Sequence, residues 1–202
     1  MTAELEASAI PGVAWGRLVR HADSRGSFRE LWRAKAFEDL DPRATGLPMG
    51  AAVRFVQSNL SESSTGVLRG LHFHRRQLDY WIVASGRAYV ALVDVRPAVE
   101  GRGSPIVDAR EVAADTTVAI PTGVAHGFLA LEPLQLIYFV TNEYDGADEL
   151  GFAWDDVEAA VPWPIVPGTP DGGPILSERD STNPSLRDLV DRIRDMEGSS
   201  PG

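Results

Sequence analysis

The stretch "GVLRGLHFHRRQLDYWIVASG", residues 66–86, decides the fold and holds two of the four histidines of the chain, His72 and His74. Its second half, "LDYWIVAS", is rich in the apolar and aromatic residues that favour β-strands. Residues two apart on a strand point to the same face, so the two imidazoles are expected to lie together. Such a pair suits metal binding, and it equally suits one catalytic base with a polar support.

The rest of the chain continues the pattern of short strands separated by turn residues. Turn chemistry occurs at 85–87, 96–105 and 121–124. The expected strands cover residues 13–20, 26–33, 53–61, 78–85, 87–95, 106–113, 116–121, 126–132 and 134–144. Many short strands at regular spacing predict an all-β protein, either a sandwich or a jelly-roll barrel.

Two helices are expected beside the strands. A short N-terminal helix is predicted over 33–40. A C-terminal helix is predicted after Asn183, which can cap it, with Pro184 at the first helical position. One face of this helix carries Leu186, Leu189, Val190 and Ile193.

The expected organisation is a single domain with two terminal segments. Residues 1–11 are predicted to be a flexible N-terminus, and 181–202 to be the C-terminal helix and tail. Residues 12–180 form the jelly-roll domain. That domain ends in a Pro- and Gly-rich arm over 161–180, which has apolar side chains to bury against the β body.

Composition excludes several functional classes. The net charge of −10 disfavours nucleic-acid binding, which requires a basic face. The chain contains no cysteine, so disulfides and thiolate chemistry are excluded. We recognise no signal peptide and no apolar run that could cross a membrane, which predicts a cytoplasmic protein with no membrane partner.

Two spacings resemble the motifs of metal-binding cupins. The first motif is matched, with aspartate where glutamate is usual, by Gly66, His72, His74, Asp79 and Gly86. The second motif is matched by Pro121, Gly123 and His126. Three histidines and one carboxylate would suit iron, manganese, nickel or zinc.

A longer and more specific resemblance is to the dTDP-4-dehydrorhamnose 3,5-epimerase family of the cupin superfamily. It rests on "GVLRGLHF" (66–73), "IPTGVAHGFLAL" (120–131), "IYFVTNEY" (137–144), "LSERD" (176–180) and "DSRGSFRELW" (23–32). These segments follow the order of the family over roughly residues 12–187. The resemblance implies a cupin-type jelly roll that forms a homodimer.

The resemblance also implies the chemistry. The substrate would be a dTDP-linked 4-keto-6-deoxy sugar, whose ketone acidifies the C–H bonds at C3 and C5. A base removes a proton to give an enolate, and an acid returns one to the opposite face. This reaction requires no redox cofactor and no metal.

Site residues follow from the matched positions. His72 matches the base, Asp180 the carboxylate that orients it, and Tyr138 the opposite acid. The expected substrate-binding residues around them are Gln57, Asn59, Arg69, His126 and Tyr144. Residues that would hold the nucleotide, partly across the dimer interface, are Arg25, Phe28 and Glu30.

Two positions depart from the family. His74 stands where the family has glutamine, and Asp79 stands where it has a lysine that helps the C4 oxygen carry negative charge. Both changes lead toward the cupin metal pattern. The first alternative is therefore a metal-dependent cupin enzyme that uses His72, His74, Asp79 and His126 to hold a divalent ion. The second is a noncatalytic protein that binds a nucleotide sugar.

Overall fold

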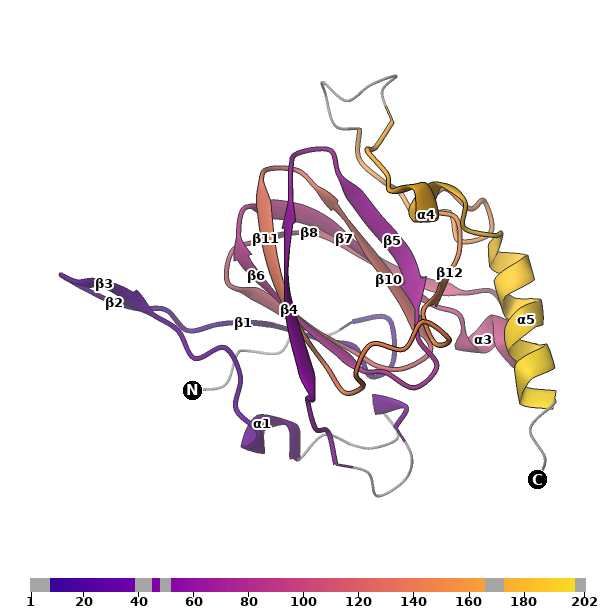
Figure 1. Ribbon diagram of the computed structural model, residues 1–202, viewed down its shortest axis with the longest axis horizontal. Helices are drawn as coiled ribbons and strands as arrows, with labels where there is room; N and C mark the ends of the chain where they lie inside the picture. Colours follow the sequence, from indigo (N-terminus) through magenta and orange to yellow (C-terminus); the bar gives the residue numbers. More distant parts are fainter. Residues whose placement is uncertain (1–7, 39–44, 48–51, 166–172, 199–202) are drawn as a thin grey trace.

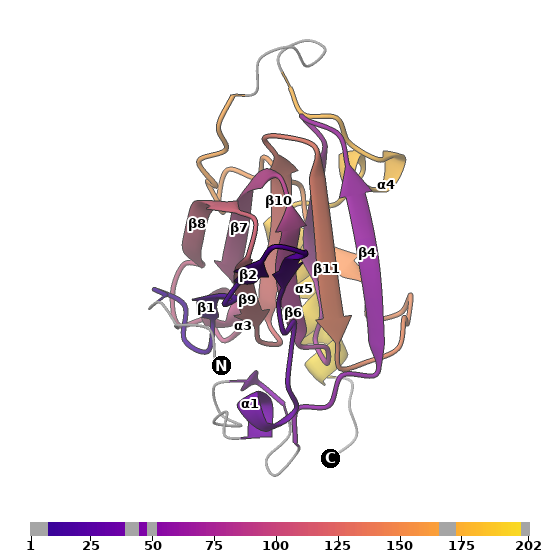
Figure 2. The ribbon, with the colours of Figure 1, turned by 90° about the vertical axis from the view of Figure 1, so that its left-hand side faces the viewer.

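Two antiparallel sheets of five strands each form the body of the protein. A computed structural model describes residues 8–38, 45–47, 52–165 and 173–198. The first sheet has the order β1 (Ala14–Arg17), β9 (Thr116–Ile120), β6 (Asp79–Ser85), β11 (Leu134–Val140) and β4 (Gln57–Ser63). The second has the order β12 (Leu150–Gly151), β5 (Leu68–Phe73), β10 (Val124–Ala130), β7 (Arg87–Asp94) and β8 (Ile106–Ala113). The sheets face each other as a jelly-roll barrel (Figures 1 and 2), which confirms the predicted fold class.

Alternation along the strands decides which side chains enter the barrel. On β6, Trp81 and Val83 pack into the core between the sheets, whereas Tyr80 and Ile82 pack on the outer face. β10 is buried at every position, because both of its faces are covered. Phe128 packs in the interior between the sheets, and Ala125 packs in the outer layer with residues of α5. This arrangement places the even-numbered positions of β10, including His126, on the inner face.

Helix α5 (Leu186–Gly198) covers the outer face of the second sheet. Its apolar face was predicted from the sequence, and all four of its members are buried against strand residues such as Leu71 and Phe73. The helix begins later than the sequence predicts. Ser185, rather than Asn183, caps it: its hydroxyl accepts from the backbone N–H of Asp188, and its carbonyl accepts from the N–H of Leu189.

Three shorter helices accompany α5 in the ranges for which the structure gives complete elements. Only Lys35–Glu38 (α1) of the helix predicted over 33–40 is a described helix, and residues 39–44 lie outside the described part. A helical turn, α3 (Arg96–Val99), occupies part of the segment predicted as a turn. The third, α4 (Glu178–Ser181), ends the C-terminal arm, which joins β5 through a bridge between Val67 and Ile175.

The N-terminal region departs most from the predicted strands. Of the segment predicted as a strand over 26–33, only Gly26–Phe28 forms a strand, β3. It pairs with β2 (His21–Asp23) in a hairpin. Figure 1 shows this hairpin projecting from the barrel on the side opposite α5. Residues 1–7 of the predicted flexible segment lie outside the described part, whereas Ile10 is buried in the core. In the ranges that the structure describes, no helix has the length and apolar character that a membrane crossing requires.

A bulge in β5 sets the positions of the site residues. His72 pairs with His126 of β10, but Arg69 pairs with Phe128, so β5 contains one more residue than β10 over this interval. Both Arg69 and His72 consequently line the barrel interior, although they are three residues apart. A regular strand would have turned one of them outward.

Candidate active site

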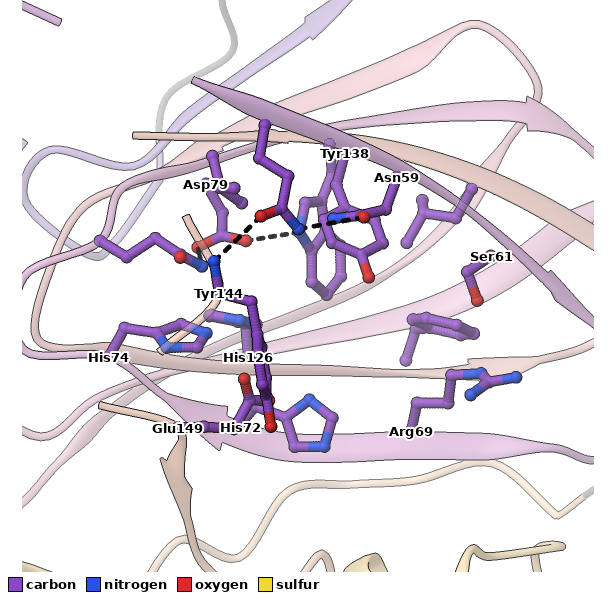
Figure 3. Close-up of a pocket in the computed structure, with 16 residues that line it drawn as sticks. Asn59, Ser61, Arg69, His72, His74, Asp79, His126, Tyr138, Tyr144 and Glu149 are labelled. Atoms are coloured by element: carbon purple, nitrogen blue, oxygen red, sulfur yellow. Dashed lines mark hydrogen bonds between the residues drawn. The ribbon is translucent and has the colours of Figure 1, made fainter. Parts of the chain in front are cut away.

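A cavity of about 390 Å³ opens into the barrel between the two sheets. Its size suits a small-molecule ligand. Figure 3 shows Arg69 and His72 on one wall and Asn59 and Tyr138 on the facing wall. The lining residues are Gln57, Asn59, Ser61, Arg69, His72, His74, Gln77, Asp79, Trp81, His126, Phe128, Leu136, Tyr138, Val140, Tyr144 and Glu149.

His72 and Asp180 form a hydrogen-bonded pair beside the cavity. The Nε2 atom of His72 lies 2.8 Å from Oδ1 of Asp180, and the Asp180 side chain is only 5% exposed. A carboxylate accepts hydrogen bonds, so Nε2 carries the proton and Nδ1 keeps the lone pair. The His72 side chain remains 24% exposed and lines the cavity, so this lone pair is available to act as a base.

The surroundings of Asp180 keep it ionised. Burial acts to raise the pKa of its carboxyl, but hydrogen bonding, first of all with His72 and also with Ser177, contributes to a pKa that is lowered overall. The hydroxyl of Ser177 accepts from the backbone N–H of Asp180 at 3.1 Å and caps α4. The carboxylate is therefore fixed in both charge and position.

Tyr138 lies on β11, in the sheet opposite His72. Burial is the main reason that the pKa of its phenol is raised, and the negative charges of Asp79 and Glu149 add to the effect. The phenol therefore remains protonated at neutral pH and can donate a proton. An imidazole and a phenol thus face each other across one cavity.

Five of the predicted substrate residues line the same cavity: Gln57, Asn59, Arg69, His126 and Tyr144. The amide of Gln57 donates to Asn59 at 3.1 Å and accepts from the backbone N–H of Tyr144 at 2.9 Å. Nε of Arg69 donates to Ser63 Oγ at 3.1 Å, which orients the guanidinium along the wall. Tyr144 is 71% exposed at the mouth of the cavity.

The three residues predicted to hold the nucleotide lie away from this cavity within one chain. Phe28 is on the projecting hairpin and is 69% exposed. Arg25 pairs with Asp23 at 2.6 Å, and Glu30 pairs with Arg33 at 2.5 Å.

The predicted set of four metal ligands is separated by the structure. Ligand atoms of His74, Asp79 and His126 lie within 4.8 Å of one another, and all three residues are buried. His72 is outside this group, because its imidazole is turned to Asp180. Burial lowers the pKa of His126 to about 4, although the charge of Asp79 opposes this shift.

Sequence reasoning missed one charged residue of the cavity, Glu149. Its Oε1 accepts from Arg179 at 2.8 Å. Burial is the largest influence and acts to raise the pKa of Glu149, but the hydrogen bond and charge of Arg179, together with the nearby His74 and His72, outweigh it, and the pKa is lowered. Glu149 immediately precedes the short strand β12, which no sequence pattern indicated. The available signal was Arg179, because it is adjacent to the predicted Asp180 and forms the ion pair with Glu149.

A barrel that holds an imidazole with its carboxylate partner, and a phenol on the facing wall, has the groups that a proton-transfer enzyme such as an isomerase needs. The chain belongs to the dTDP-4-dehydrorhamnose 3,5-epimerase family, whose model matches residues 7–188. It is therefore a sugar-nucleotide epimerase, as the sequence predicts.

Individual relatives agree with this assignment. A dTDP-4-dehydrorhamnose 3,5-epimerase of Pseudomonas aeruginosa is 33% identical over 183 residues, covering 89% of this chain and 94% of the relative. The solved rmlC epimerase of Mycobacterium tuberculosis is 33% identical with a TM-score of 0.79, over 95% of this chain and 92% of that one. ChmJ, a 3'-monoepimerase from Streptomyces bikiniensis solved with dTDP-quinovose, is 27% identical with a TM-score of 0.72, over 92% of this chain and 89% of that one.

Proposed function

We propose that this protein epimerises a dTDP-linked 4-keto-6-deoxy sugar at C3, at C5 or at both carbons. The observation that carries the proposal is the His72–Asp180 pair facing Tyr138 across one cavity. C3 and C5 both adjoin the C4 ketone, so removal of either proton gives an enolate.

The reaction proceeds in two proton transfers. Nδ1 of His72 takes the proton from carbon, and the electron pair of the C–H bond forms the enolate double bond while the carbonyl electrons move to the C4 oxygen. Asp180 stabilises the imidazolium that results. Tyr138 then delivers its phenolic proton to the opposite face, and the ketone reforms. Proton exchange with water restores both side chains, so the net reaction is an isomerisation.

Binding of the substrate uses the other polar residues of the cavity. Gln57 and Asn59 present amides to the sugar. His126 lines the buried part of the cavity, and Tyr144 lies at its mouth. Arg69 is positioned to pair with the diphosphate, since a guanidinium forms charge-assisted bonds with phosphate oxygens.

A homodimer is part of this proposal. The β2–β3 hairpin is exposed along its whole length and projects from the barrel (Figure 1), and Phe28 is the last residue of its second strand. In a dimer, this hairpin and the residues just after it would bring Arg25, Phe28 and Glu30 to the nucleotide bound by the partner. Light scattering would measure the mass in solution, and a monomer would contradict this part of the proposal. The cytoplasmic location also stays a prediction.

The deciding experiment is proton NMR of dTDP-4-keto-6-deoxyglucose in D₂O with the protein as purified. Deuterium should appear at C3, at C5 or at both, and an inverted product should follow. Deuterium at C3 alone would identify a 3-epimerase. Saturable binding of dTDP with no deuterium uptake would contradict catalysis on this substrate and leave the noncatalytic binding protein.

A further inference from the structure

A second cluster of polar side chains occupies the cavity beside the His72–Asp180 pair. Its members come from three places in the fold: His74 just after β5, Asp79 at the start of β6, and His126 on β10. One ligand atom from each side chain lies within 4.8 Å of the others. Figure 3 shows the three residues grouped at one end of the cavity, apart from Arg69 and Ser61.

Hydrogen bonds to main-chain carbonyls fix both imidazoles. Nδ1 of His74 lies 3.1 Å from the carbonyl oxygen of Asp148, and Nδ1 of His126 lies 3.1 Å from that of Val124. A carbonyl oxygen only accepts, so each Nδ1 carries the proton and each Nε2 keeps a lone pair. Histidines that ligate metals are usually held in this way, by a second-sphere hydrogen bond from the other ring nitrogen.

Asp79 lacks a cationic partner in the described part of the chain. The residue is 3% exposed, and its carboxylate accepts from the neutral donors Gln77 Nε2 at 3.0 Å and Trp81 Nε1 at 3.4 Å. A buried carboxylate without a counter-charge is costly. Three electron-pair donors thus converge on one point, and a bound cation would satisfy all of them.

We propose that His74, Asp79 and His126 bind one divalent first-row transition-metal ion. Two imidazole nitrogens and one carboxylate oxygen form a ligand set that zinc, iron, cobalt, nickel and manganese accept. Three protein ligands leave at least one coordination position for water or for an oxygen of the substrate.

The role of the ion rests on the proposed function. Formation of the enolate places negative charge on the C4 oxygen, and a cation near this oxygen lowers the barrier. Of the described residues that line the cavity, Arg69 is the only arginine or lysine, whereas Asp79 and Glu149 are carboxylates. An ion held by His74, Asp79 and His126 would offset the local negative charge and supply Lewis-acid stabilisation to the C4 oxygen, while His72 removes the proton.

The binding test uses full-length protein stripped with a chelator and then titrated with Zn²⁺ by calorimetry. Co²⁺ provides a second readout, because its visible absorption reports bound nitrogen and oxygen ligands, and Zn²⁺ should displace it. Wild-type protein should bind one ion per chain. His74→Gln and Asp79→Asn should weaken binding by more than about 100-fold, since loss of a ligand exceeds the 10- to 100-fold effect of losing its support.

Two variants from the same cavity are matched controls. His72→Gln changes a histidine two positions from His74, and Glu149→Gln changes the other carboxylate that lines the cavity. Both should bind the ion as wild-type protein does. Circular dichroism would confirm folding of each variant, and the Co²⁺ spectrum of the wild-type protein tests the site without any substitution.

Deuterium uptake then separates the two proposals. Stripping should reduce uptake about 100-fold, the effect of losing one stabilising group at a developing oxyanion, and Zn²⁺ should restore it. Absent or multiple weak binding, or unchanged binding in His74→Gln and Asp79→Asn, would overturn the metal site. Site-specific binding with uptake unchanged by stripping would overturn the role of the ion. No uptake in any form, with one ion bound, would contradict the proposed function while the site stands.

Discussion

The Nε2 atom of His72 lies 2.8 Å from Oδ1 of Asp180, although 108 positions separate the two residues in the chain. His72 belongs to β5, whereas Asp180 belongs to α4 at the end of the C-terminal arm. The arm is joined to β5 by the parallel bridge at Ile175, whose carbonyl accepts from the N–H of Leu68 at 3.0 Å. Docking of the arm therefore assembles the base with its carboxylate.

Replacement of His72 should remove proton transfer and leave the fold. We expect His72→Gln to reduce deuterium uptake by about 10²- to 10⁴-fold, the usual contribution of a general base. The side chain is 24% exposed, so the cost in stability should be small. Asp191→Asn, on the exposed face of α5 and outside the cavity, is the control and should keep full uptake. Uptake by His72→Gln at the wild-type rate would show that another group is the base.

Replacement of Asp180 should change the pH dependence of stability. The folded-state pKa of Asp180 is lowered, so its ionised form stabilises the protein above its unfolded pKa of about 3.9. This contribution is lost as the pH falls through the folded pKa. The difference in unfolding free energy between wild type and Asp180→Asn should therefore be larger at pH 7 than at pH 3. Urea titrations at both values would measure it, and an equal difference would contradict an ionised carboxylate paired with His72.

Replacement of Tyr138 should separate proton removal from inversion. Tyr138→Phe keeps the ring and removes only the proton donor, while His72 and Asp180 are unchanged. We expect deuterium uptake to continue, because a deuteron can return to the face from which the proton was removed. Formation of the inverted epimer should fall by about 10²-fold or more. NMR coupling constants distinguish the two epimers. Loss of uptake and inversion to the same extent would argue that Tyr138 is not the opposite acid.

The strands were predictable because alternation and turn residues are local signals. The strand expected at 106–113 has those bounds in the structure, and 87–95 differs from β7 by one residue. The N-terminal region was less predictable, since its conformation depends on contacts with residues far away in the sequence. After Phe28 the chain leaves the hairpin, and Leu31 packs with Tyr80 on the outer face of the first sheet. No local pattern reports that contact.

The candidate site was predictable mainly through resemblance. No periodicity connects His72 with Asp180, and only the matched family motifs placed them together. The limit of local reasoning is clearest at His74: spacing predicts that it shares a face with His72, and both line the cavity, but spacing leaves its role open. In the structure His74 follows the end of β5 and hydrogen bonds to Asp148, so it joins Asp79 and His126 instead.

A close approach of two backbones supports the wall of the cavity at Gly127. A Cβ atom at this position would lie 2.8 Å from the carbonyl oxygen of Arg69 and 3.2 Å from Cα of Gly70. Both neighbours are backbone atoms of the β5 bulge, so they cannot move as a flexible side chain would. Only glycine fits there without displacing β5.

Gly127→Ala should therefore destabilise the protein by about 1–3 kcal/mol, the usual cost of overpacking a core. It should also reduce deuterium uptake, because the displaced strand carries both Arg69 and His72. Gly173→Ala is the matched control, since a Cβ atom there meets nothing within 4 Å. Urea unfolding and the NMR assay would measure the two effects. Wild-type stability and uptake in Gly127→Ala would mean that β5 is free to shift, and that its bulge does not fix the position of the base.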